Sequence, residues 1–192
     1  MRRWYARRGV AWTPLLACCA LALVGAAFGR AWPNAVGVLL PAALALCSAG
    51  AGFVFDEPAS VVVAVTPRGA GWRRSTRVAV ALIPLAVWFG VLASLPAGTG
   101  SQRAAWGLAG SACVLLATAA AGLASRAQVT APGASIAAVV ALGLLGPHLM
   151  SPFLGWDPLP GGPFPDSVVT FWLALTGAGV LACAWALRPG LR

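Results

Sequence analysis

The sequence has no lysine and very little acidic charge. Charged residues make up 9% of its 192 residues; all 13 basic residues are arginine, and Asp and Glu together number 4. A soluble globular domain carries about 25% charged residues, because its water-facing surface needs them. The scarcity of charge therefore excludes an ordinary water-soluble domain, and the high apolar content excludes intrinsic disorder.

Residues that usually carry catalysis or bind metals are also scarce. Without lysine the chain has no phosphate-binding loop of the Walker type, so it cannot hydrolyse ATP by that chemistry. The cysteines lie in apolar stretches at spacings that match neither a metal site nor a disulfide framework: Cys18, Cys19, Cys47, Cys113 and Cys183. We therefore expect no catalytic, cofactor-binding or metal-binding residues in this chain.

Apolar residues, in contrast, reach 60% of the sequence. A membrane-spanning helix needs roughly 20 mostly apolar residues. Six stretches meet this requirement, at 13–29, 35–55, 78–96, 104–125, 134–150 and 168–187. Charged residues or clusters of proline, glycine and asparagine separate them. The sequence thus predicts an all-α polytopic membrane protein, a single transmembrane domain over residues 1–192 with six transmembrane helices.

The arginines predict the orientation of these spans. With the N-terminus in the cytoplasm, eleven of the 13 arginines lie inside, and only Arg30 and Arg103 lie outside. The positive-inside rule therefore places both termini in the cytoplasm. The residues expected to set this topology are Arg2, Arg3, Arg7, Arg8, Arg73, Arg74 and Arg77. The net charge of +9 then reflects topology and an affinity for anionic lipid headgroups, and no nucleic-acid partner is expected.

The connection between the second and third spans differs from a plain polar loop. It begins with Asp56 and Glu57, followed by Pro58, an order that suits the first turn of a helix. Five apolar residues, 61–65, then precede Thr66-Pro67. Such a run is costly in water unless lipid or protein covers it, although valines also suit a strand. We therefore expect a short cytoplasmic coupling element here, docked on a partner protein or on the lipid headgroup layer.

In this connection the chain resembles the membrane (permease) subunits of type-two ATP-binding-cassette exporters. The family carries a coupling helix between spans two and three, with an acid, a small and apolar run, a Thr-Pro or Ser-Pro and an aromatic residue, in that order. The family's Gly-Thr-Leu after the acid is replaced here by residues 58–60. The segment 147–167, between spans five and six, lies where the family has a re-entrant or capping element. The resemblance assigns ATPase coupling to Asp56, Glu57, Pro58, Val61, Val62, Val63, Val65, Thr66, Pro67 and Trp72.

This resemblance implies a permease subunit in a bacterial inner (cytoplasmic) membrane. It would pair with itself or with a related permease subunit, and a separate ATPase would drive export of an amphiphilic or hydrophobic substrate. One alternative is a non-transporting accessory or assembly subunit, whose valine run contacts another partner. In another, the run lies in the headgroup layer while Arg73, Arg74 and Arg77 pair with lipid phosphates. A secondary carrier or channel is disfavoured, because the predicted spans contain no charged residue.

Overall fold

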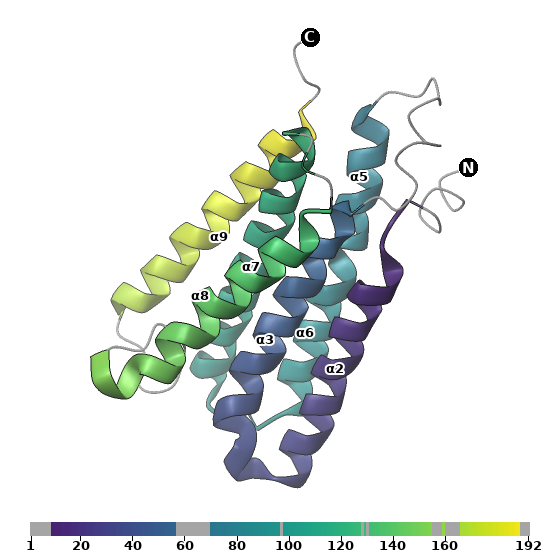
Figure 1. The fold of residues 1–192 in the computed structure, drawn as a ribbon. Coiled ribbons are helices and arrows are strands. Elements are labelled where there is room, and N and C mark those ends of the chain that lie inside the picture. The colour runs from purple at the N-terminus through teal and green to yellow at the C-terminus, as the bar shows by residue number, and fades with distance from the viewer. Residues whose placement is uncertain are drawn as a thin grey trace.

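The computed structural model describes residues 9–56, 70–96, 98–127, 129, 131–154, 159 and 166–188. This part of the chain is helical and contains no strand (Figure 1). Within it, six helices are long and apolar enough to cross a membrane, counting α5 and α6 together as one span. The prediction of an all-helical chain with six potential spans is therefore confirmed for the described residues, as expected of a multi-pass membrane protein.

The helices follow the predicted spans closely. Their bounds are α2 (Trp12–Ala31), η1 (Pro33–Ala35), α3 (Val36–Gly52), η2 (Phe53–Phe55), α5 (Ala70–Val80), α6 (Leu82–Ser94), α7 (Gly100–Arg126), α8 (Gly133–Leu154) and α9 (Asp166–Leu187). Three boundaries differ from the prediction by four residues or more. The third span begins within a helix that already starts at Ala70, the fourth begins at Gly100, and the fifth continues through Pro152 to Leu154.

The third span is broken between α5 and α6. Ala81 separates the two helices, and its N–H donates to the carbonyls of Arg77 and Val78, each at 3.1 Å. Pro84 accounts for the position of this break, because a proline lacks an N–H and its ring clashes with the carbonyl four residues earlier, here that of Val80. The polar helix α5 precedes this break and contacts η2 and α9.

The helices run alternately up and down. The end that holds the start of α2 and the end of α9, uppermost in Figure 1, is here called the upper end, and the opposite end the lower end. Arg77, Arg126 and Arg188 lie toward the upper end, whereas Arg30 in the last turn of α2 and Arg103 in the first turn of α7 lie at the lower end. The described arginines are thus sorted between the two ends as the sequence predicted.

Helices α3 and α7 form the buried centre of the bundle. α2, α6 and α8 pack against α3, while α9 packs along α7. The Trp88 side chain of α6 is fully buried, and its Nε1–H donates to the Trp106 carbonyl of α7 at 3.3 Å. Their rings lie 6.2 Å apart at a tilt of 56°. This pair fills the α6–α7 contact opposite Gly110, where no side chain competes for the space.

Candidate functional site: an apolar cavity and a polar junction

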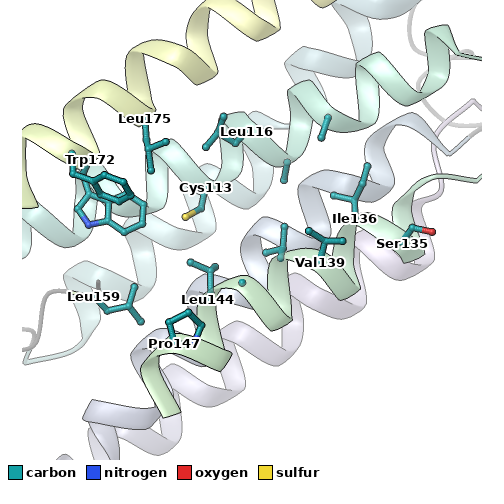
Figure 2. Close-up of a pocket in the computed structure, with 15 residues that line it drawn as sticks. Cys113, Leu116, Ser135, Ile136, Val139, Leu144, Pro147, Leu159, Trp172 and Leu175 are labelled. Atoms are coloured by element: carbon teal, nitrogen blue, oxygen red, sulfur yellow. The ribbon is translucent and has the colours of Figure 1, made fainter. Parts of the chain in front are cut away.

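A cavity of about 620 Å³ lies between α7, α8 and α9. Cys113 and Leu116 of α7 lie behind it, Leu144 of α8 is on one side, and Trp172 and Leu175 of α9 are on the other (Figure 2). None of the lining side chains is charged, and Ser135, at one end, carries the only hydroxyl among them. The lining can therefore hold a hydrocarbon group but offers nothing to pair with a charge.

The cavity opens sideways between α8 and α9. These two helices pack mainly against α3 and α7 respectively rather than against each other. Two large apolar side chains of the lining are accordingly exposed, Val139 by 70% and Phe171 by 45%. In a bilayer this opening faces the lipid chains, so an apolar molecule can enter from the membrane without crossing water.

The lower end of the cavity is lined by one described residue of the connection between α8 and α9. Leu159, only 3% exposed, lies there beside Pro147 (Figure 2). Leu159 belongs to the segment in which the sequence predicted a re-entrant or capping element. Most of the residues around it lie outside the described part of the chain, so only the position of Leu159 agrees with a cap.

At the upper end, Asp56 joins the end of the second span to the start of α8. The Gly133 N–H donates to Asp56 Oδ1 at 2.8 Å, across 77 positions of sequence. A carboxylate is favourable there, because the unpaired N–H groups and the helix dipole make a helix N-terminus positive. Position 133 has no room for a side chain, since a Cβ would lie 2.6 Å from Asp56 Oδ2. Glycine is thus needed for this close approach.

Arg77 completes this polar junction, which we define as Asp56, Arg77 and Gly133 with the carbonyls of Gly9 and Phe55. The Arg77 side chain is only 6% exposed. Its guanidinium donates to the Phe55 carbonyl at 3.1 Å and to the Gly9 carbonyl at 3.4 Å, and it lies 5.7 Å from the centre of the Phe55 ring. An arginine expected to set topology at the membrane edge is therefore buried between three segments of the chain.

Burial raises the pKa of Asp56 above its ordinary value of 3.8, while the Gly133 N–H and the charge of Arg77 act to lower it. A raised pKa means that the folded state favours the protonated carboxyl. Asp56 therefore contributes stability at pH values below 3.8, and this contribution is lost as the pH rises through the raised pKa.

We expect Asp56→Asn to remove this pH dependence. The asparagine oxygen can still accept the Gly133 N–H but cannot ionise. The melting temperature of the variant relative to the wild type should increase as the pH rises above 3.8, and then level off. Thermal melting of both proteins in one detergent over a pH series measures this difference. If the wild type instead becomes more stable relative to Asp56→Asn as the pH rises, the attraction of the carboxylate to Arg77 outweighs the cost of its burial.

A second contact at the upper end joins α7 to α9. The Arg126 guanidinium donates to the Arg188 carbonyl and lies 5.2 Å from the centre of the Trp185 ring. Both arginines are at least partly open to the surroundings of the protein. This contact keeps a positive charge at the upper end of the α7–α9 pair.

Most of the predicted coupling residues lie outside the described part of the chain: Glu57, Pro58, Val61, Val62, Val63, Val65, Thr66 and Pro67. Arg2, Arg3, Arg7 and Arg8 also lie outside it. Trp72, Arg73 and Arg74 belong to α5, a helix that replaces the expected end of the loop. Asp56 and Arg77 are the predicted residues that the structure brings together. Gly133 and the cavity were not identified from the sequence, although Gly133 follows Pro132 at a predicted helix start.

Among the described residues, no group of three His, Cys, Asp or Glu side chains is placed to hold a metal ion. Comparison with protein-family models, with curated proteins and with solved structures found no match to this chain.

Proposed function

We propose that this protein is the permease subunit of an ATP-binding-cassette exporter in the bacterial inner membrane. A separate ATPase would dock on the cytoplasmic segment 56–72, and two permease subunits, identical or related, would form the translocation pathway. The upper end of the bundle would then be cytoplasmic, together with both termini. The apolar cavity favours an amphiphilic or hydrophobic cargo, because it offers no charged group.

The observation that carries this proposal is the attachment of both ends of the coupling segment to other spans. Asp56, at its start, is bonded to the N-terminus of α8. Arg77, just beyond its end, donates to two backbone carbonyls. One is that of Phe55, which follows the C-terminal end of α3, and the other is that of Gly9, which precedes the N-terminal end of α2. A force applied to the segment by a partner would therefore reach three spans. One of these spans, α8, is a wall of the cavity.

The test is co-purification of an ATPase subunit with the full-length protein, followed by measurement of ATP hydrolysis by the complex. Glu57→Lys reverses a charge at the proposed contact, and Val62→Asp with Val63→Asp places carboxylates in the apolar run. Both variants should fold and insert but lose the ATPase, or lose the response of its activity to cargo. Val129→Asp is a matched control, because Val129 is 52% exposed at the same end of the bundle but lies outside the segment.

Two outcomes would overturn the proposal. If the coupling variants export cargo in reconstituted vesicles as well as the wild type does, the segment does not couple an ATPase. If the wild type co-purifies with a stable partner that neither binds nor hydrolyses ATP, the chain is an accessory or assembly subunit of another complex.

A further inference from the structure

The cavity has the dimensions of a slot parallel to the spans. It extends along α8 from Ser135 near the upper end to Pro147 near the lower end (Figure 2). At 1.5 Å per residue, α8 rises about 18 Å between these two residues. One leaflet of the hydrocarbon core of a bilayer is about 15 Å deep. A hydrocarbon chain that occupies one leaflet therefore matches the slot in length and direction.

The chemistry of the slot also matches a hydrocarbon chain. Its side chains are almost entirely apolar, and the hydroxyl of Ser135 points outward at the upper end (Figure 2). An empty slot would forfeit dispersion contacts along three helices, because its lining would have no partner atoms on one side. Since the slot opens to the membrane beside the exposed side chains of Val139 and Phe171, acyl chains are the molecules that can reach it.

The charges at the upper end specify the other part of the ligand. Arg126 ends α7 six residues beyond Ala120, a lining residue, and Arg188 follows α9. The described carboxylate at this end is that of Asp56, which is already bonded to Gly133 and lies near the charge of Arg77. Among the described residues, Arg126 therefore offers a positive charge beyond this end of the slot, where the headgroup of a lipid whose acyl chain fills the slot would lie.

We propose that the slot binds one acyl chain of an anionic phospholipid, which enters sideways between α8 and α9 and places its phosphate beside Arg126. An amphiphile with a long acyl chain and an anionic headgroup is then the class of cargo that the exporter handles. This assignment of cargo rests on the proposed function. Occupancy of the slot by lipid does not, and it can be tested on this chain without an ATPase.

The experiment is photo-cross-linking in nanodiscs of phosphatidylcholine. The full-length protein is reconstituted with a trace of phosphatidylglycerol that carries a diazirine in its acyl chain, or with phosphatidylcholine that carries the same chain. Mass spectrometry then locates the adducts. We expect them to concentrate on lining residues such as Leu116, Val140 and Leu175, more strongly with phosphatidylglycerol, and to exceed those on the exposed Leu21 and Val38 of other spans.

Gly143→Phe tests whether the adducts come from the slot. A Cβ at this lining position meets no heavy atom within 4 Å, so the phenyl group can enter the slot without distorting α8. Adducts on the lining should fall to the level seen on Leu21. Gly90→Phe, on the exposed face of α6 with equally open surroundings, should leave them unchanged. Gly143→Leu serves as a smaller blocking variant if Gly143→Phe fails to fold.

Arg126→Gln tests the headgroup. This variant should lose the preference for the phosphatidylglycerol probe, whereas Arg126→Lys should keep it, because lysine retains the charge. Two results would overturn the proposal. One is adducts that spread evenly over all exposed spans, and the other is adducts on the lining that persist in a folded Gly143→Phe variant. An equal yield from the two probes in the wild type would overturn the assignment of an anionic headgroup. If the adducts show that lipid occupies the slot but no ATPase couples to the protein, only the proposed function is refuted.

Discussion

Replacing Gly110 by alanine is expected to destabilise the protein severely. A Cβ at this position would overlap the indole of Trp88, which is fully buried between α6 and α7. Overpacking of a dense core typically costs about 1–3 kcal/mol, and occasionally more. The indole would also have to give up its hydrogen bond to the Trp106 carbonyl, at a further cost of about 0.5–1.5 kcal/mol. Melting in detergent, followed by size-exclusion chromatography, should show a large drop in melting temperature.

Gly25→Ala is the matched control for this change. It lies in α2, another spanning helix, but a Cβ there meets no heavy atom within 4 Å. Its melting temperature should equal or exceed that of the wild type, since alanine favours a helix over glycine. If steric overlap with Trp88 is the cause, Trp88→Leu should rescue part of the loss in the double variant, because neighbouring residues do not act additively. Equal losses from Gly110→Ala and Gly25→Ala would contradict this packing.

The second large effect is expected from Arg77→Met. The methionine leaves the carbonyls of Phe55 and Gly9 without their bonds to the guanidinium. Hydrogen bonds to charged groups contribute about 1.5–3 kcal/mol each. Asp56 also loses the positive charge that favours its ionised form. We expect a protein that melts well below the wild type or that does not accumulate in the membrane.

Arg77→Lys separates charge from geometry. Lysine keeps the charge, but its single ammonium group cannot reproduce the planar fork that reaches two carbonyls. The melting temperature of Arg77→Lys should therefore fall between those of Arg77→Met and the wild type. Arg103→Met is the control at the lower end, where an exposed arginine donates to the Leu95 carbonyl at 3.4 Å. This control should melt close to the wild type. Indistinguishable melting of the Met, Lys and wild-type proteins would show that the junction is not structural.

The number and positions of the spans could be predicted from hydrophobicity alone, because each apolar stretch has nearly the length that a bilayer requires. The break at Ala81 follows from Pro84, a proline that the sequence places inside the third span, four residues after Val80. Residues 70–77, the first part of α5, were assigned to the connection before the third span because most of them are polar. Polarity reports which solvent surrounds a residue, and a polar helix can extend beyond the membrane as well as a loop can.

The junction and the cavity could not be predicted, because both depend on contacts between distant parts of the chain. The sequence identified Asp56 as an acid suited to a helix N-terminus. It did not indicate that the helix is α8, 77 residues away, rather than the segment that follows Asp56. The cavity is lined mainly by apolar residues of the same kinds as those on the exposed surfaces of the spans, so its residues carry no distinguishing pattern. Its existence depends on the angle between α8 and α9.

The unequal burial of the six spans has a consequence for biogenesis. The most buried windows lie in α3 and α7, at 67% and 56%, whereas those of α8 and α9 are only 6% and 17% buried. Domains generally begin to fold from the N-terminus during synthesis. The first four spans can therefore assemble their central contacts, including Trp88 against Trp106, before the last two leave the ribosome. α8 and α9 then pack onto a surface that has already formed. A nascent chain that stops before Gly133 should therefore hold its first four spans together, although Asp56 does not yet have its bond to the N-terminus of α8.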